Sequence, residues 1–208
     1  MHKLVATINS LKTAPVSSLV QKRLSDFEKM HLTGNREWFC ELCFCLLTAN
    51  TSAEMGLKVQ NALGFDGFFG LPEKKLSSKL QALGYRFYNR RAEFITLARK
   101  HADIRDKVKS MGSEHDARVW LDENVKGLGL KESSHFLRNV GYKNLAIIDR
   151  HVLNILDEHG VHEKPKTMSP KNYFAIEKKL EQICGRTEMT QAELDLYLWY
   201  MKTGKVLK

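Results

Sequence analysis

The chain has 208 residues and a mass of 23.9 kDa, which allows one good hydrophobic core or two small cores that share a cleft. Hydrophobic residues make up 43% of the chain, and no apolar run approaches the ~20 residues of a membrane span. The first residues lack a signal-peptide pattern. We therefore expect a cytoplasmic protein without a membrane partner. The net charge of +9 favours a polyanion such as nucleic acid, although many soluble basic proteins bind none.

Helical periodicity runs through almost the whole chain, whereas alternating β-branched runs are nearly absent and no Asn-Gly hairpin signal occurs. The sequence therefore predicts an all-α protein of roughly ten helices with short, glycine-containing connections. It contains no repeat of solenoid period and no low-complexity tract.

An apolar run over residues 38–47 carries three of the four cysteines, Cys40, Cys43 and Cys45. Zinc and iron–sulfur sites take well-spaced ligands from loops, with a fourth ligand nearby. Cys184 lies far away and has no second ligand beside it. We therefore interpret the cysteines as small buried hydrophobic residues, and a structural disulfide is disfavoured in a reducing compartment.

Two helices are predicted in the segment that follows this run. Residues 77–83 form an apolar-periodic stretch that closes at Gly84, a residue suited to a left-handed helix end. Residues 87–101 place Phe94, Leu97 and His101 on one face of the next helix.

The densest pattern is an expected pair of helices joined by a short glycine turn, over about residues 116–141. The first helix is expected over about residues 116–126, and the second runs to Gly141. Gly127 and Gly129 let the turn bend sharply and bring its N–H groups close to a bulky ligand. In a DNA-binding helix-hairpin-helix this ligand is a phosphate, bound without regard to sequence. An ordinary αα-hairpin with a tight turn explains the pattern equally well.

Lys131 lies in the first turn of the second expected helix, where the positive end of the helix dipole favours a neutral amine. A neutral amine suits a nucleophile that attacks a carbon atom and forms an imine. The alternative is a phosphate-binding or simply solvated lysine, as most lysines are.

Asp149 follows the apolar run at residues 145–148 and precedes a helical stripe that ends near Gly160. A carboxylate in such a position is a helix N-cap, a functional acid or both. Residues 162–168 then form the most loop-like stretch of the chain.

Capping signals predict the last two helices. Ser169 provides an N-cap before Pro170 at the first helical position, and Gly185 is expected to close that helix. Thr190 and Glu193 form a capping box that opens the last apolar segment.

Together these residues resemble the helix-hairpin-helix DNA glycosylase superfamily, and within it the type-2 8-oxoguanine DNA glycosylase/AP lyases of archaea and some bacteria. Lys131 falls on the catalytic lysine of that motif, and Asp149 falls on its catalytic aspartate. His151 matches the histidine of the Asp-x-His element, which lies near the DNA backbone in related enzymes. The resemblance covers nearly the whole chain.

Two further stretches resemble loops of the larger 8-oxoguanine enzymes. Residues 84–88 resemble their Gly-Tyr-Arg-x-x-Tyr stretch, so Arg86 would address the base opposite the lesion. Residues 48–51 resemble their Asn-rich loop, so Asn50 would help to fill the space that an extruded base leaves.

An extruded purine requires a flat apolar pocket, and Trp199 and Phe87 are the candidates to form it. The resemblance implies that Trp199 and the terminal residue Lys208 line this pocket. Packing in the core of its own helix is the alternative role for Trp199.

The resemblance implies a base-excision repair enzyme that flips out and excises 8-oxoguanine from double-stranded DNA. It would then cleave the abasic strand by β-elimination through a Schiff base on Lys131, while Asp149 stabilises the positive sugar. We expect a monomer that needs no redox cofactor or catalytic metal. By analogy the hairpin would bind a monovalent cation through the backbone carbonyls of Glu123, Val125 and Leu128.

The resemblance also implies two helical subdomains, with the helix-hairpin-helix at the cleft. One covers residues 33–143 and ends in the hairpin, and the other combines residues 1–32 with 144–208. The four-cysteine cluster of endonuclease III is missing, since Cys184 is the only late cysteine. The chain has no strand pattern for the N-terminal β-domain of the eukaryotic-type enzymes, and Lys131 argues against the monofunctional members.

Two other classes of protein remain open. A non-catalytic helix-hairpin-helix DNA-binding module would explain the hairpin, but it has no use for a nucleophile and a carboxylate. A metalloenzyme would use the cysteine run or the group of His159, His162 and Glu163. Those histidines lie three apart beside a glycine, which is poor ligand geometry without a defined helix.

Overall fold

The computed structural model describes all 208 residues, and its regular structure is helical throughout. Twelve α-helices and one 3-10 turn are present, more than the sequence predicted, and there is no strand. The predicted all-α fold is confirmed. None of the helices combines the length and the apolar character that a bilayer crossing requires.

The chain divides into two units. One unit is Met30–Val140, and the other combines Met1–Lys29 with Gly141–Lys208. These limits lie close to the expected boundaries at 33 and 143. The subdomains themselves stay a prediction.

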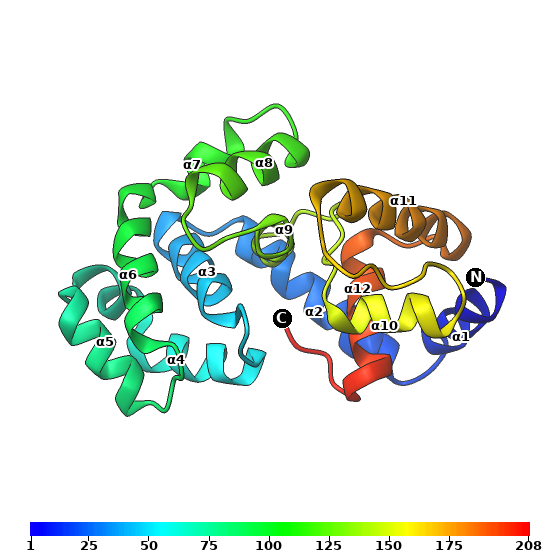
Figure 1. The fold of residues 1–208 in the computed structure, drawn as a ribbon, viewed down its shortest axis with the longest axis horizontal. Helices are drawn as coiled ribbons and strands as arrows, with labels where there is room; N and C mark the ends of the chain where they lie inside the picture. Colours follow the sequence, from blue (N-terminus) through cyan, green and yellow to red (C-terminus); the bar gives the residue numbers. More distant parts are fainter. The chain divides into compact units, whose positions relative to one another are not determined.

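The unit Met30–Val140 holds the elements from light blue to yellow-green in Figure 1. These are α3 (Asn35–Thr48), α4 (Ala53–Gly70), α5 (Glu73–Ala82), α6 (Tyr88–Ala98), η1 (Arg99–His101), α7 (Ile104–Lys109), α8 (Glu114–Asn124) and α9 (Leu130–Asn139). The other unit holds the remaining helices: α1 (His2–Lys12), α2 (Val16–His31, whose last two residues belong to the first unit), α10 (Arg150–Glu158), α11 (Pro170–Thr187) and α12 (Gln191–Thr203).

Helix α3 is the centre of the unit Met30–Val140. Nearly every side chain from Trp38 to Thr48 is buried, because the run is apolar all round and α4, α6, α7 and α9 pack against it. Cys43 and Cys45 are fully buried and no cysteine forms a disulfide, as expected for small hydrophobic residues. Burial raises the pKa of the Cys43 thiol well above its usual value, and burial likewise raises the pKa of Cys184 to about 12.

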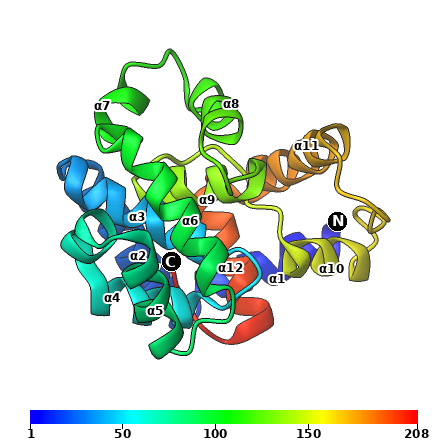
Figure 2. The same cartoon turned by 60° about the vertical axis from the view of Figure 1, so that its left-hand side comes forward.

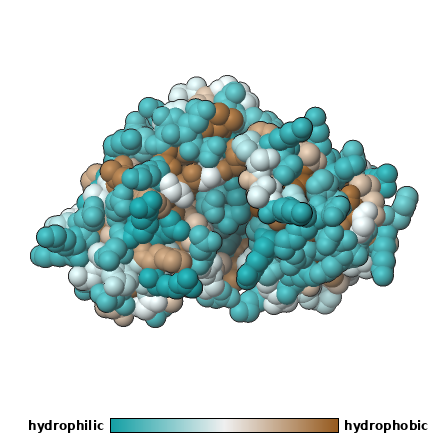
Figure 3. All heavy atoms as spheres, viewed as in Figure 1, coloured by the Kyte–Doolittle hydropathy of each residue, from teal (hydrophilic) through white to brown (hydrophobic).

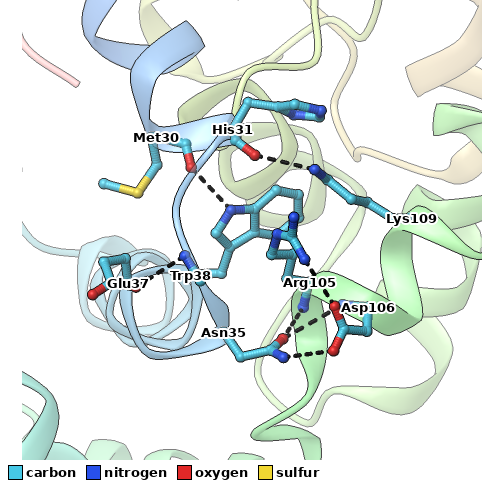
Figure 4. A network of polar contacts seen from close by, with 9 residues as sticks. Met30, His31, Asn35, Glu37, Trp38, Arg105, Asp106 and Lys109 are labelled. Carbon is cyan, nitrogen blue, oxygen red and sulfur yellow. Dashed lines mark hydrogen bonds and ion pairs between the residues drawn. The ribbon is translucent and has the colours of Figure 1, made fainter.

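A polar network fixes α7 to the start of α3 (Figure 4). The Asn35 side chain accepts a hydrogen bond from the backbone N–H of Arg105 at 2.8 Å and donates to Asp106 Oδ2 at 2.7 Å. Lys109 Nζ donates to the carbonyl of His31 at 3.2 Å. The indole N–H of Trp38 donates to the carbonyl of Met30, so the buried tryptophan is satisfied where α2 ends.

The predicted helix starts near the C-terminus are confirmed. Ser169 Oγ accepts from Asn172 N, with Pro170 at the first position of α11, and Thr190 Oγ1 accepts from Glu193 N at the start of α12. The predicted end at Gly185 is wrong, because α11 continues to Thr187 and Glu188 takes the left-handed conformation at φ 55°.

The visible face of the molecule is mostly hydrophilic, with scattered hydrophobic side chains (Figure 3). The largest exposed hydrophobic fraction belongs to Leu32, at 79%. Isolated exposed side chains of this kind are ordinary on soluble proteins.

Candidate active site

Helices α8 and α9 form the predicted helix-hairpin-helix and lie side by side in both ribbon views (Figures 1 and 2). The turn between them begins at Val125, whose carbonyl accepts a hydrogen bond from Leu128 N at 3.1 Å. Gly127 has φ +100°, a conformation that side chains rarely adopt, and Gly129 is the N-cap of α9. The hairpin is therefore confirmed, with its helices within two residues of the predicted limits.

Phe94 of α6 lies directly beneath the turn. A Cβ atom added to Gly127 would lie 2.8 Å from Phe94 Cε2 and closer still to Cδ2, so the glycine is required for this packing. The guanidinium of Arg90 lies 5.0 Å from the Phe94 ring centre and that of Arg91 lies 5.3 Å from it. Lys126 Nζ lies 6.0 Å from the same centre and pairs with Glu93 at 2.9 Å.

We expect Gly127→Ala to destabilise the protein by about 2–5 kcal/mol, because the substitution adds both backbone strain and overlap with Phe94. Gly129→Ala is the matched control. Its φ is −117° and the nearest atom to the added Cβ would be 3.5 Å away, so the expected loss is within about 1 kcal/mol. Denaturant unfolding of the two variants measures the difference, and equal stabilities would contradict the packing role of Gly127.

Lys131 occupies the second position of α9, and 30% of its side chain is exposed. Its Nζ lies 2.9 Å from Glu132 Oε1, a partner that the sequence reasoning did not include. The expectation of a neutral amine considered the helix dipole alone and did not include this ion pair. The candidate nucleophile, Lys131, therefore forms an ion pair with Glu132.

Two carboxylates lie beside Gly129. A Cβ atom on this glycine would be 3.5 Å from Glu132 Oε2 and 4.0 Å from Asp122 Oδ1. Burial raises the pKa of the Asp122 carboxyl, the charges of Glu123 and Glu132 raise it further, and Arg118 opposes them. Two acidic side chains therefore lie at the start of α9, beside its N-cap Gly129.

Hydrogen bonds join the loop of Asn50, expected to fill the space of the extruded base, to the segment around Arg86, expected to address the base opposite the lesion. Tyr85 donates its hydroxyl proton to the carbonyl of Leu47, and Arg91 Nη2 donates to the carbonyl of Ala49 at 2.7 Å. Both donors are buried, so they fix the backbone at the end of α3, just before Asn50. Asn50 is exposed in that turn, in the left-handed conformation at φ 62°.

Arg86 and Phe87 follow Tyr85 in the chain and lie at the start of α6. Arg86 is exposed and its guanidinium lies 4.6 Å from the centre of the Phe87 ring. A stacked guanidinium of this kind is held in place while its N–H groups stay available to a ligand. Arg91, the buried residue that supports the Asn50 turn, was missed from sequence, since nothing in the local pattern marks it as buried.

Asp149 belongs to the other unit, where it is the N-cap of α10. Its Oδ1 accepts hydrogen bonds from the backbone N–H of His151 at 2.8 Å and of Val152 at 2.9 Å. The N-cap role that the sequence left open is thus present, and Oδ2 makes no hydrogen bond within the protein. Lys131 and Asp149 lie in different units, so their pairing stays a prediction.

The segment before Asp149 is fixed by hydrogen bonds to both backbone groups of Ala146, its N–H and its carbonyl. Tyr173 of α11 donates its hydroxyl proton to the Ala146 carbonyl at 2.6 Å, and Glu177 Oε1 accepts from the Ala146 N–H at 3.0 Å. These buried bonds satisfy an extended stretch that has no sheet partner. They therefore fix the position from which Asp149 starts α10.

His151 and Trp199 meet in the same unit. Their ring centres lie 5.0 Å apart at an angle of 83°, an edge-to-face contact between α10 and α12. The Trp199 Nε1 atom is buried without a hydrogen-bond partner in the protein. Lys208 is half-buried at the end of the chain. The structure thus brings Asp149, His151 and Trp199 together, while the pocket roles of Trp199, Phe87 and Lys208 stay predictions.

No group of three His, Cys, Asp or Glu side chains lies close enough to hold a metal ion. The monovalent cation expected at Glu123, Val125 and Leu128 stays a prediction. The carbonyl of Val125 already accepts one hydrogen bond within the turn, and its second lone pair is compatible with a cation.

The hairpin, its glycine turn and the lysine at the start of α9 define a helix-hairpin-helix protein. A family model described as 8-oxoguanine DNA glycosylase matches residues 20–189. The 8-oxoguanine DNA glycosylase/AP lyase of Methanocaldococcus jannaschii is 48% identical over 206 residues, which cover 99% of both chains. That of Korarchaeum cryptofilum is 50% identical over 207 residues, which cover 99% of this chain and 98% of the relative.

Solved structures agree with these matches. The crystal structure of the M. jannaschii enzyme in complex with a 15mer DNA containing 8-oxoguanine has a TM-score of 0.97 and 48% identity, covering 99% of this chain and all of that one. The structure of the 8-oxoguanine DNA glycosylase of Thermotoga maritima has a TM-score of 0.93 and 39% identity, with both chains fully covered. The chain belongs to the 8-oxoguanine DNA glycosylase family.

Proposed function

We propose that this protein removes 8-oxoguanine from double-stranded DNA and then cleaves the abasic strand. The observation that carries the proposal is the match over 99% of the chain to relatives named 8-oxoguanine DNA glycosylase/AP lyase. A relative of the same fold has been crystallised with DNA that contains 8-oxoguanine, which supports duplex DNA as the partner. The net charge of +9 is consistent with a phosphate-rich ligand.

In the proposed mechanism the damaged nucleotide leaves the base stack before any bond is broken. The hairpin turn at Gly127 and Gly129 binds the DNA backbone through its N–H groups, with His151 near the backbone as well. Arg86 and Asn50 contact the bases around the vacated position. Trp199, Phe87 and Lys208 line the pocket for the extruded guanine.

Two side chains carry the proposed chemistry. Asp149, as a carboxylate, stabilises the positive charge on the sugar while the glycosidic bond breaks. Lys131 attacks C1′ and displaces the base, and opening of the C1′–O4′ bond gives the imine. The imine makes a proton on C2′ acidic, so that β-elimination breaks the C3′–O bond and cuts the strand. The protein acts as a monomer in the cytoplasm, and the steps require no redox cofactor.

Incubation with an end-labelled duplex that holds one 8-oxoguanine opposite cytosine tests the proposal. We expect free 8-oxoguanine in solution together with a nicked strand that ends in the unsaturated aldehyde of β-elimination. An identical duplex with guanine is the control and stays intact. Tight binding without release of the base would instead identify a non-catalytic helix-hairpin-helix module.

A further inference from the structure

The residue that follows Lys131 carries a carboxylate to which the proposed mechanism gives no role. Glu132 Oε1 lies 2.9 Å from Lys131 Nζ, and only 16% of the Glu132 side chain and 30% of the Lys131 side chain are exposed. By comparison, the Arg36–Asp66 pair leaves 62% and 89% of its side chains exposed. The Lys131–Glu132 pair is therefore better shielded from water, and shielded charges interact more strongly.

This contact is not an automatic result of adjacency. Neighbouring residues on a helix point in different directions, so consecutive side chains do not normally face each other. Glu132 reaches Lys131 because its carboxylate folds back over the start of α9, where Gly129 has no side chain. One oxygen lies beside Gly129, 3.5 Å from where a Cβ atom would be, and the other contacts the amine.

We propose that Glu132 is a catalytic residue of imine formation, which carries protons from Lys131 Nζ to the oxygen that leaves C1′ of the sugar. The inference rests on the proposed function, because it requires Lys131 to be the nucleophile. Its basis is that Glu132 is the carboxylate in contact with the reacting nitrogen in the unit Met30–Val140.

The proton balance of imine formation calls for such a group. At an abasic site C1′ is an aldehyde carbon, and Lys131 begins as an ammonium ion with three protons on nitrogen. One proton first leaves the ammonium ion, which frees the nitrogen lone pair; this lone pair then forms the bond to C1′, and the bonds between C1′ and its aldehyde oxygen break. One proton stays on the imine nitrogen, and the other two leave with the oxygen as water, so that mass and charge balance.

A carboxylate in contact with the nitrogen can accept each of these protons in turn and return it to the oxygen. The first transfer precedes attack, because an ammonium nitrogen has no lone pair, and the second accompanies bond formation, because the nitrogen becomes more acidic as it shares its lone pair with carbon. Asp149 retains its separate task of stabilising the sugar cation during base release. Glu132 acts in the step that follows or accompanies attack by Lys131.

A structural role of Glu132 at the start of α9 has to be distinguished from the proposed catalytic role. Glu132 is the third residue of α9 after the N-cap Gly129, and a carboxylate at this position stabilises a helix start. Glu37 occupies the same position of α3 after the N-cap Gly34, where its Oε2 accepts from the Gly34 N–H at 3.1 Å. Glu37→Gln is therefore the matched control for the helix-start contribution.

The experiment measures borohydride trapping in a single turnover on a duplex with a preformed abasic site, so that base excision is not required. We expect Glu132→Gln to trap about 100-fold more slowly than wild type, while its affinity for a duplex with a stable tetrahydrofuran site is unchanged. Glu132→Asp keeps a carboxylate, so its trapping rate falls less than that of Glu132→Gln. Glu37→Gln traps at the wild-type rate. Added formate accelerates trapping by Glu132→Ala, because a small carboxylate replaces the missing one.

Wild-type trapping rates in Glu132→Gln overturn the inference, and so does a slow Glu132→Ala variant that formate leaves unchanged. The failure of the proposed function looks different. In that case the wild-type protein itself forms no adduct, or the adduct maps to a residue other than Lys131.

Discussion

Replacement of Lys131 by glutamine is expected to abolish the borohydride-trapped adduct with 8-oxoguanine DNA and to slow strand cleavage by at least about 10³-fold. The amide nitrogen of glutamine has no available lone pair, so no imine forms. Glutamine still accommodates the position, because the lysine side chain is 30% exposed and its only ion pair is with Glu132. The protein should therefore fold and bind lesion DNA normally.

Lys126→Gln is the matched control for this prediction. Lys126 is an exposed hairpin lysine whose Nζ also lies 2.9 Å from a glutamate, Glu93. Its removal deletes the same charge from the same motif and should leave trapping intact. A trapped adduct that persists in Lys131→Gln and maps to another lysine by peptide mass spectrometry would contradict the assignment of the nucleophile.

Helix starts could be predicted from sequence because their signals are local. The hydroxyls of Ser169 and Thr190 each accept from the N–H three residues later, and this geometry depends only on the cap and the first turn. The same holds for Asp149, whose carboxylate caps α10. Such positions need no knowledge of the remainder of the fold.

The end of α11 illustrates what local signals miss. Gly185 suggested a C-terminus, yet a Cβ atom there would meet nothing within 4 Å, and the helix simply continues. Thr187 bonds back to the carbonyl of Ile183, and Glu188 takes the left-handed conformation that glycine usually supplies. Glycine permits a helix end without requiring one.

The candidate site was predicted in its individual residues but not in its contacts. The glycines and the lysine of the hairpin follow from a compact pattern, and the helix-hairpin-helix is present where expected. The Lys131–Glu132 contact depends on a carboxylate folding back beside Gly129, which regular helix geometry does not predict. Arg91 likewise supports the Asn50 turn across 42 residues of sequence.

The second large effect is expected from Asp149→Asn. Asparagine is as good an N-cap as aspartate, so its side-chain oxygen can still accept from the N–H groups of His151 and Val152. Only the negative charge is lost. We expect lesion DNA to bind with wild-type affinity while base excision slows by about 10²–10⁴-fold, because the sugar cation is no longer stabilised.

A comparison of Asp149→Asn with Asp149→Ala and Ser169→Ala separates the capping role of the Asp149 side chain from its catalytic role. Both alanine variants lose an N-cap and should lose about 0.5–2 kcal/mol of unfolding free energy, whereas Asp149→Asn should lose little. Ser169→Ala should excise 8-oxoguanine normally, which shows that a missing cap alone does not stop the enzyme. If Asp149→Asn also excised the base at the wild-type rate, the carboxylate would serve α10 alone, and the charge that stabilises the sugar would have to come from another residue.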